Sequence, residues 1–354
     1  MAEDKRRRDD AADAAADAAD AADAAGTGDT HNGVRIRLFD ADETDGNLSF
    51  DDALRLKVSA RQLMWIDVEG RLTDEQRERL AERFELPPTT ERKLAKPTDK
   101  PGVQLHGRHF VLHLAAELDP VDPRRVGWLD IVAGPNVVIT QHEGPVSALG
   151  SMNQRIAKDA TVGVADSAEF VAAVGEAILT GYHAAIDRVE DELDDFDAKA
   201  LLRSQPTDLI GGLVQIRRRI GRLRRVLAAH RELYAALGSP DFARGIDSED
   251  SQVFVPLAAR FETVLASLES TREAVLGSFD ILMTRTGQRT NDIMRVLTVA
   301  TVLAIPATIS AGFLGMNLIV PLPDDDPGAF WIVLGAIILI ELALLAIARW
   351  RGWI

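Results

Sequence analysis

Short runs in which apolar and polar residues alternate fill the chain between about residues 33 and 163. Five of them predict β-strands because alternation places one apolar face on each strand. These runs are Val34–Ala41, Leu63–Gly70, His109–Leu118, Gly127–Gly134 and Asn136–Glu143. Between the second and third runs, "LTDEQRERLAERFEL" has a helical period, and Thr73 with Gln76 three residues later is a capping-box pattern. The pattern predicts an α/β module over residues 33–163.

The apolar spacing becomes helical over residues 164–251. Ser167–Leu201 is acidic toward its end, and Thr207–Leu237 is basic. Opposite charges on consecutive helices joined by a short break predict an antiparallel hairpin whose faces attract. A basic helix could also lie on anionic lipid or nucleic acid. The neighbouring acidic helix favours the hairpin.

A third helical region begins near Pro256 and contains no further proline until Pro306. It predicts a stalk helix over residues 252–295 that continues into an apolar segment. At the rise of an α-helix, Leu257–Asn317 would be about 90 Å long. That length exceeds a globular core and suits a stalk that enters a membrane.

Two apolar segments, Val296–Leu314 and Phe330–Ala348, are each long enough to cross a bilayer. We therefore predict transmembrane helices over residues 296–317 and 330–348. An external loop over residues 318–329 would join them, and a basic C-terminus over residues 349–354 would follow. Two buried core helices of a soluble protein are the alternative.

Positive charge is distributed unevenly around these segments. Three arginines precede the first segment, and two follow the second: Arg285, Arg289 and Arg295, then Arg349 and Arg351. The connecting loop "NLIVPLPDDDPGAF" has no Lys or Arg. The positive-inside rule therefore places the loop outside and both termini in the cytoplasm. Tryptophans at the segment ends fit an aromatic belt: Trp331, Trp350 and Trp353.

One face of the long helix carries many small and polar residues, spaced alternately by four and three. Its members are Asp280, Thr284, Gly287, Asn291, Met294, Thr298, Thr301, Ile305, Thr308, Gly312 and Gly315. This heptad spacing lets parallel helices pack around a common axis. Small and hydroxyl residues also permit close helix packing in lipid. A water-filled path between several copies and simple packing are both compatible with the pattern.

Polar groups follow where the first apolar segment would meet outside water. In a ring of copies, the carbonyl oxygens of Asn317 would converge, and such oxygens suit a hydrated Mg²⁺ held through its waters. Asp324, Asp325 and Asp326 in the same loop would attract cations to the mouth of a pore. The three acids equally fit a solvated turn between prolines.

Composition narrows the class of protein. The chain has 354 residues, a formal charge of −15 and a pI near 5.0, which argues against nucleic acid as a partner and suits attraction of cations. It contains no cysteine, so it has no disulfide or thiolate site. Met1–Asn32 is an Ala/Asp-rich stretch, which predicts a disordered low-complexity tail without a signal-peptide core.

Enzyme motifs are absent from the sequence. It has no phosphate-binding glycine loop, HExxH motif or nucleophile elbow, so we expect neither an enzyme nor a cofactor beyond a transported ion. His106, His109 and His113 form a tight cluster. Metal binding by His109 and His113 on one strand face is the less favoured interpretation, and ordinary polar positions are favoured.

The sequence resembles the CorA family of divalent-cation channels. The resemblance is carried by Gly315-Met316-Asn317 after "TNDIMRVLTVATVLAIPATISAGFL", by the ending "RWRGWI", and by "WIDVEG" and "NVVITQHE" upstream. It covers most of residues 33–354. It implies an α+β cytoplasmic funnel domain, long helices, two C-terminal transmembrane helices and a homopentamer in the cytoplasmic membrane.

The resemblance also implies site residues. A selectivity filter for hydrated Mg²⁺, with Co²⁺ and Ni²⁺ as mimics, falls on Gly315, Met316 and Asn317. The pore-lining positions would be Asp280, Asn291, Met294, Leu297, Thr301, Ile305 and Thr308. This set largely coincides with the heptad stripe but takes Leu297 in place of Thr298.

Two departures from the family pattern affect the interpretation. Some members sense Mg²⁺ through carboxylates near the start of the stalk, where this chain reads "VFVPLAAR" over residues 253–260, although Asp247, Glu249 and Asp250 are near. Glu341 lies inside the second apolar segment, and an intramembrane acid is a functional candidate. Glu341 could carry protons, as in zinc transporters of the ZntB type, or lie protonated at a subunit contact.

We therefore predict a Mg²⁺ channel for uptake into the cytoplasm. A zinc transporter, with or without proton coupling, is the first alternative. A non-conducting membrane-anchored coiled-coil scaffold is the second, and it would leave Asn317 and the threonines unexplained.

Overall fold

The computed structural model describes residues 33–40, 45–59, 61–96, 100–118, 126–156, 166–202, 207–246, 252–315 and 327–351. The predicted N-terminal tail lies outside these ranges, as do Met316, Asn317 and the three loop aspartates, Asp324, Asp325 and Asp326.

The described residues form seven strands and a series of helices. The strands are β1 (Val34–Asp40), β2 (Gly46–Asn47), β3 (Gln62–Glu69), β4 (Gly102–His106), β5 (His109–Leu118), β6 (Val126–Gly134) and β7 (Val137–His142). The helices are α2 (Phe50–Arg55), α3 (Asp74–Arg83), α4 (Pro88–Ala95), α5 (Ser147–Ile156), α6 (Ser167–Leu202), α7 (Thr207–Leu237), α8 (Pro240–Gly245), α9 (Phe254–Gly315) and α10 (Pro327–Trp350).

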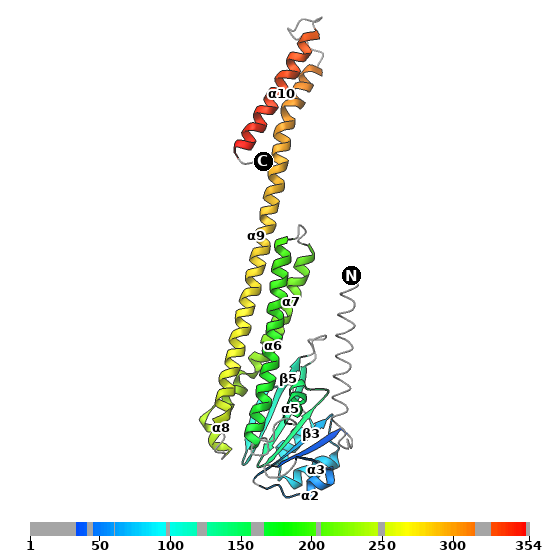
Figure 1. Ribbon diagram of the computed structural model, residues 1–354, viewed down its shortest axis with the longest axis vertical. Coiled ribbons are helices and arrows are strands. Elements are labelled where there is room, and N and C mark those ends of the chain that lie inside the picture. The colour runs from blue at the N-terminus through cyan, green and yellow to red at the C-terminus, as the bar shows by residue number, and fades with distance from the viewer. Residues whose placement is uncertain are drawn as a thin grey trace. The chain divides into compact units, whose positions relative to one another are not determined.

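Internal contacts divide the chain into two compact units. The first unit is Met1–Phe196 with Gly212–Val275, and the second is Asp197–Gly211 with Leu276–Ile354. Helix α9 therefore contributes residues to both (Figure 1). The first unit holds the sheet, and the second holds the C-terminal part of α9 together with α10.

The strands form one mixed sheet in the order β2-β1-β3-β7-β6-β5-β4. Strands β3 and β7 pair in parallel at its centre, with Ile66 opposite Ile139. All five predicted strands are confirmed to within about two residues at each end. Strands β2 and β4 were not predicted, because β2 has two residues and β4 has no buried residue to produce an apolar alternation.

Local sequence sets the start of α3 as predicted. The Thr73 hydroxyl accepts a hydrogen bond from the Gln76 amide at 3.1 Å, and the Gln76 side chain accepts one from the Thr73 amide at 3.0 Å. This reciprocal arrangement is the capping box, which satisfies two amide groups that helix geometry leaves free. Leu80 on the same helix is buried against the sheet.

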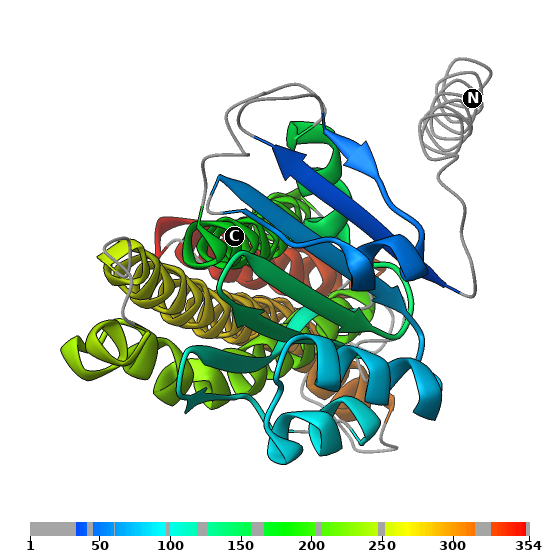
Figure 2. The ribbon, with the colours of Figure 1, turned by 90° about the horizontal axis from the view of Figure 1, so that it is seen from below.

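Helices lie on both faces of the sheet (Figure 2), and each face carries a core. On one face, Leu80 of α3 and Leu94 of α4 join Ile66 and Ile139 in a buried cluster. On the other, Phe170 of α6 lies 5.2 Å from Trp65 of β3, measured between ring centroids. Helices α8 and α9 add further aromatic contacts there, with Phe242 and Phe254 packed edge-on to Phe110.

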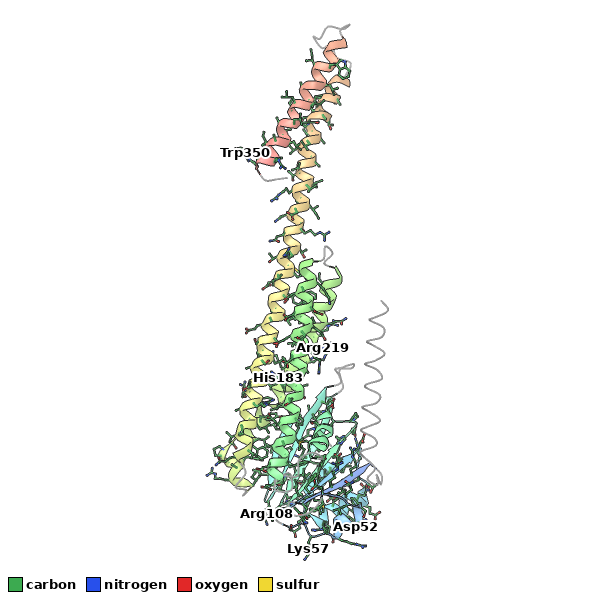
Figure 3. All side chains as sticks on the ribbon, in the orientation of Figure 1. Asp52, Lys57, Arg108, His183, Arg219 and Trp350 are labelled. Atoms are coloured by element: carbon green, nitrogen blue, oxygen red, sulfur yellow. The ribbon has the colours of Figure 1, made fainter. Side chains whose placement is uncertain are left out.

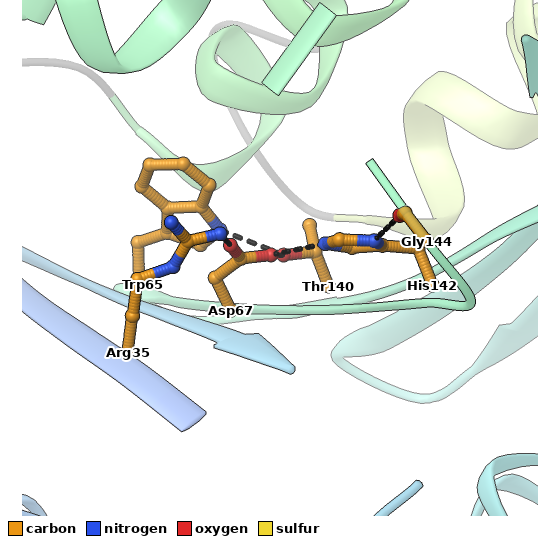
Figure 4. A network of polar contacts seen from close by, with 6 residues as sticks. All are labelled: Arg35, Trp65, Asp67, Thr140, His142 and Gly144. Atoms are coloured by element: carbon orange, nitrogen blue, oxygen red, sulfur yellow. Dashed lines mark hydrogen bonds and ion pairs between the residues drawn. The ribbon is translucent and has the colours of Figure 1, made fainter. Parts of the chain in front are cut away.

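A buried polar network crosses the parallel strand pair (Figure 4). The Thr140 hydroxyl donates to Asp67 Oδ1 at 2.7 Å and accepts from the Trp65 indole at 2.9 Å. His142 Nε2 lies 3.2 Å from the same carboxylate oxygen, and Arg35 donates to Oδ2 at 3.0 Å. Each oxygen of the buried Asp67 carboxylate therefore has a donor.

Hydrogen bonding and charge compete with burial in this network. Burial by itself raises the pKa of Asp67, but bonds from His142 and Thr140, with the charges of His142 and Arg35, outweigh it and leave the pKa below its ordinary value. Burial likewise lowers the pKa of His142, and its contacts with Asp67 and the Gly144 carbonyl reverse the direction. Both shifts are in the direction that favours a carboxylate beside an imidazolium.

Ion pairs connect the basic helix α7 to two neighbours. Arg219 pairs with Glu192 of α6 at 2.5 Å, as the opposite charges predicted (Figure 3). Two further pairs reach α9, from Arg224 to Glu269 at 2.6 Å and from Arg231 to Glu262 at 3.0 Å. The predicted attraction between the acidic helix α6 and the basic helix α7 is confirmed. Acidic residues of α9 also face α7 and pair with its arginines, which was not predicted from the sequence.

Candidate functional site

Helix α9 is continuous over 62 residues, from Phe254 to Gly315, as the scarcity of breakers predicted. Pro306 lies inside it. A proline has no amide hydrogen, so the carbonyl of Val302, four residues earlier, loses its helical donor. The predicted stalk and the first apolar segment are thus parts of one helix, and Gly315 is its last residue.

One side of this helix faces α10 within the second unit. On α9 the covered side chains are Val299, Leu303, Pro306, Ala307 and Ser310. On α10 the half-buried row is Leu334, Ile337, Glu341, Leu344 and Ala348. Val299 and Leu303 line a common cavity with Leu344 and Ala348, which identifies these rows as the contact faces. Glu341 therefore lies on the side of α10 that is turned toward α9.

The predicted polar stripe lies on the opposite, uncovered side of α9. Thr301 and Val299 differ by two residues, so their directions differ by about 160° around the helix. Large apolar stripe residues confirm the exposure: Met294 is 55% exposed, Leu297 58% and Ile305 48%. Side chains of this size are normally covered. Val296 at 69% and Ile332 at 74% are exposed on other sides of the two helices, so exposure is compatible with a shared path at this face and does not by itself select it.

The threonine hydroxyls on this face are oriented by the helix itself. Thr301 donates to the Leu297 carbonyl at 2.8 Å, and Thr308 to the Ala304 carbonyl at 2.7 Å. Thr298 donates to the Met294 carbonyl in the same way. Each hydroxyl has a single hydrogen, so the oxygen can only accept from outside the helix. The stripe therefore presents acceptors, which suit the hydrogen atoms of water around a cation.

A groove runs along the same face. It is lined by Ala300, Thr301, Ala304, Ile305, Thr308 and Ile309, with a volume of about 550 Å³. Alanines at 300 and 304 open it, because small side chains lower the helix surface between larger neighbours. Both Thr301 and Thr308 thus border space that is open in a single chain.

The other predicted site residues have different positions. Asp280 and Asn291 are exposed on α9, in the part that precedes the apolar segment. Leu297 and Thr298 are both exposed, so the structure does not choose between them. The filter residues Met316 and Asn317 and the aspartates Asp324, Asp325 and Asp326 are outside the described residues, and their roles stay predictions.

The start of α9 contains a basic residue in place of a carboxylate cluster. Arg260 pairs with Glu176 of α6 at 2.8 Å, and Phe254 and Leu257 are buried. Across the described ranges, no group of three or more His, Cys, Asp or Glu side chains could hold a metal ion. The part of the chain that is described therefore gives no support to metal-sensing carboxylates at the start of the stalk.

The histidine cluster has structural partners at some of its ring nitrogens, whereas Nε2 of His106 and Nε2 of His113 are buried without a hydrogen-bond partner among the described residues. His113 is buried, with Nδ1 at 2.7 Å from Asp130, and its ring stacks on Trp128 at 4.6 Å. His109 is half-buried, and burial lowers its pKa. These contacts favour the interpretation of ordinary polar positions over metal binding.

Two features of the site were missed by sequence reasoning. The row that packs on α10 has the same heptad spacing as the stripe, so the period alone does not tell which face is covered. The hydroxyl orientation depends on side-chain rotamers. The only sequence signal for this orientation is a threonine inside a helix, where the carbonyl four residues earlier can accept its hydroxyl hydrogen. Such threonines are too common for the signal to be specific.

By length and composition, one helix of the described part could span a membrane. The segment is Phe254–Gly312, and 6% of its most apolar stretch is buried. Core helices of soluble proteins pass the same test, but they are mostly buried. The exposure of this stretch separates it from such a core helix.

Comparison with known proteins identifies the family. The model of the CorA-like Mg²⁺ transporter protein family matches residues 60–349, well over half of the chain. The chain belongs to this family. The resemblance carried by the Gly-Met-Asn sequence is thereby confirmed.

Characterised relatives have low identity to this chain. The cobalt/magnesium transport protein CorA of Methanocaldococcus jannaschii is 24% identical over 229 residues, which cover 64% of this chain and 71% of that protein. The protein of the same name from Thermotoga maritima is 25% identical over 142 residues, or 40% of each chain.

Solved structures share the fold. The complete CorA magnesium transporter of Methanocaldococcus jannaschii matches with a TM-score of 0.70 at 21% identity, over 91% of this chain and 98% of that one. The ZntB cytoplasmic domain of Vibrio parahaemolyticus matches with a TM-score of 0.57 at 14% identity, over 72% of this chain and 99% of that one. The α+β architecture of sheet and long helices is therefore that of the CorA soluble domain.

Proposed function

We propose that this protein conducts divalent metal cations, chiefly Mg²⁺, into the cytoplasm through a pore lined by α9. The observation that carries the proposal is the uncovered face of α9, where Thr301 and Thr308 present acceptor oxygens beside an open groove. Membership of the CorA-like Mg²⁺ transporter family supports the same conclusion.

A single α9 cannot enclose a path, so the pore requires several copies. We propose a homopentamer in which each copy turns this face inward, with α10 as a second membrane span on the outside. The loop between the spans would then face the exterior and both termini the cytoplasm. The open groove beside Thr301 and Thr308 supports association at this face.

Selection of the ion would take place at the external end of α9. Gly315 ends the helix, and Met316 and Asn317 follow it directly in the sequence. A ring of Asn317 carbonyl oxygens would hold a divalent ion through its hydration waters, which Mg²⁺ releases reluctantly. Asp324, Asp325 and Asp326 would raise the local cation concentration at this mouth.

Mg²⁺ is preferred to Zn²⁺ because the Gly-Met-Asn sequence is intact and two relatives bear the name cobalt/magnesium transport protein. Co²⁺ and Ni²⁺ are expected to permeate as mimics. Zinc transport remains the second candidate, favoured by the likeness to the ZntB domain and by Glu341 on the α9-facing side of α10. A coiled-coil scaffold that conducts nothing is the third.

The test is Mg²⁺ entry into proteoliposomes that contain a trapped Mg²⁺-sensitive dye. Wild-type protein is expected to admit Mg²⁺, and Asn317→Ala protein is expected to lose entry or selectivity over Ca²⁺. Entry that is indifferent to Asn317→Ala would contradict the filter. No entry of Mg²⁺ from well-assembled protein, with entry of Zn²⁺ under an imposed pH gradient, would favour the zinc transporter. No entry of either ion would favour the scaffold.

A further inference from the structure

A partly enclosed apolar cavity lies between α9 and α10. It has a volume of about 250 Å³, and its walls include Val299 and Leu303 of α9 and Leu344, Ile347 and Ala348 of α10. These side chains are all hydrocarbon. A hydrocarbon-lined cavity of about 150 Å³ stays dry and binds benzene, so this larger cavity suits an apolar occupant with several carbons.

Positive charge borders one end of the cavity. Arg351, directly after α10, is part of the lining. Arg295 precedes Val299 by four residues and so projects from the same side of α9, one turn beyond the cavity. Arg295 and Arg351 are exposed, and neither has an ion-pair partner among the residues that the structure describes. An apolar interior with unneutralised cations at one end matches an anionic amphiphile.

We propose that this cavity binds one acyl chain of an anionic phospholipid, with the phosphate held by Arg351 and Arg295. Trp350, next to Arg351, is 85% exposed and marks the level of a membrane interface (Figure 3). The inference rests on the proposed membrane position of α9 and α10, and it is independent of the ion transported. The lipid would come from the cytoplasmic leaflet, where the arginines lie.

The bound lipid would connect two helices with different roles. Its chain would touch Val299 and Leu303, on the reverse side of the helix that carries Thr301. It would therefore stabilise the packing of α10 on α9 without entering the proposed path. Free phosphate lacks the acyl chain that would fill the cavity. A zwitterionic lipid has the chain but lacks the net negative charge that would attract the two arginines.

The test uses full-length protein in detergent, titrated with phosphatidylglycerol, with phosphatidylcholine of the same acyl chains, or with glycerol phosphate. Retained lipid is measured by native mass spectrometry, and the thermal midpoint is measured in parallel. We expect phosphatidylglycerol to be retained about thirtyfold better than phosphatidylcholine, because each of the two arginines contributes a factor of about five near an anionic headgroup. Glycerol phosphate should change neither quantity.

Variants separate the two parts of the site. Ala348→Phe fills the cavity and should abolish retention of both lipids. Arg351→Gln should reduce the preference for phosphatidylglycerol to about fivefold, since Arg295 remains, while phosphatidylcholine is still retained. Arg349→Gln, at the same helix end but outside the cavity lining, is the matched control and should behave as wild type. If Ala348→Phe does not assemble, Ala348→Leu gives the same comparison with a smaller change.

Three results would overturn the inference. Equal retention of the two lipids by wild type would show that no anionic site exists, and failure to retain any lipid would show that the cavity does not bind an acyl chain. Equal losses in Arg349→Gln and Arg351→Gln would show diffuse attraction instead of a site. Mg²⁺ entry is scored separately, so its absence with intact lipid retention would contradict the proposed function alone.

Discussion

The imidazole Nε2 of His142 lies 3.2 Å from Oδ1 of Asp67, and both side chains are buried between the parallel strands β3 and β7. The pKa of Asp67 lies below its ordinary value and that of His142 above it. Since the pKa values of the two groups shift in opposite directions, the stability that they contribute is lost both toward low pH and toward high pH.

The sign of each dependence follows from linkage between proton binding and folding. A lowered pKa makes Asp67 stabilise the fold above its unfolded value, about 3.9, and this is lost as the pH falls. A raised pKa makes His142 stabilise the fold below its unfolded value, about 6.5, and this is lost as the pH rises through the folded pKa. The pair should stabilise most between these limits.

We therefore expect His142→Gln to reduce the free energy of unfolding more at pH 6 than at pH 9. Thermal unfolding of the purified full-length protein at both pH values measures this difference. Asp67→Ala should cost about 3 kcal/mol or more at pH 6, because it removes one partner of a buried ion pair. A cost of His142→Gln that is unchanged or larger at pH 9 would contradict the raised pKa of His142.

Aromatic packing should matter more than ion pairing at the α7–α9 contact. The rings of Tyr234 and Phe261 stack with centroids 4.3 Å apart, and Phe261 is fully buried. Phe261→Ala should lower the free energy of unfolding by about 3–5 kcal/mol. Arg231→Ala removes the ion pair between Arg231, whose side chain is 63% exposed, and Glu262, whose side chain is 50% exposed. Because both partners are exposed, this change should cost less than about 1 kcal/mol. Denaturant unfolding of the two variants would contradict this ranking if the costs were similar.

Two glycines on α6 should respond differently to alanine. A Cβ on Gly175 would lie 2.9 Å from a Leu257 methyl group, whereas one on Gly181 would meet nothing within 4 Å. Alanine is favoured over glycine in a helix by up to about 1 kcal/mol. Gly181→Ala should therefore raise the thermal midpoint, and Gly175→Ala should raise it less or lower it. Equal increases would show that Leu257 moves aside freely.

Glu341→Gln tests whether the acid of α10 takes part in transport. Its side chain is on the α9-facing side of α10, away from the stripe of Thr301 and Thr308. Mg²⁺ entry driven by its own gradient should therefore stay close to the wild-type rate. A large loss of entry, together with loss of any response to a pH gradient, would instead favour the proton-linked zinc transporter.

Sequence reasoning succeeded where the determinants are local. The capping box of Thr73 and Gln76 uses residues three apart, and the continuity of α9 follows from the scarcity of breakers between Pro256 and Pro306. The network of Asp67 and His142 joins residues 75 apart in the chain, and no local pattern reports such a contact. Strand β4 was missed for a related reason, since its pairing with β5 comes from the sheet and not from its own alternation.

The site was predictable in part. Hydropathy and spacing identified the stripe on α9, but they could not decide which of two heptad rows α10 covers. That choice depends on side-chain packing between two helices. In a single chain, Val299 is only 8% exposed whereas Met294 is 55% exposed. This difference shows that α10 covers the row of Val299 and leaves the stripe of Met294 open.

The central claim is that the uncovered face of α9 lines the ion path and that its reverse face does not. Thr308→Val and Ser310→Ala provide the comparison, since both remove a hydroxyl at nearly the same level of the helix. Thr308 belongs to the open stripe, and Ser310 is half-buried on the side toward α10.

The measurement is the initial rate of Mg²⁺ entry into dye-loaded proteoliposomes that contain equal amounts of assembled protein. Thr308→Val should reduce the rate about tenfold, because losing these acceptors for the hydrated ion raises the barrier by roughly 1.4 kcal/mol in total. Ser310→Ala should leave the rate close to that of wild type. Equal effects of the two variants, or a loss confined to Ser310→Ala, would contradict the account.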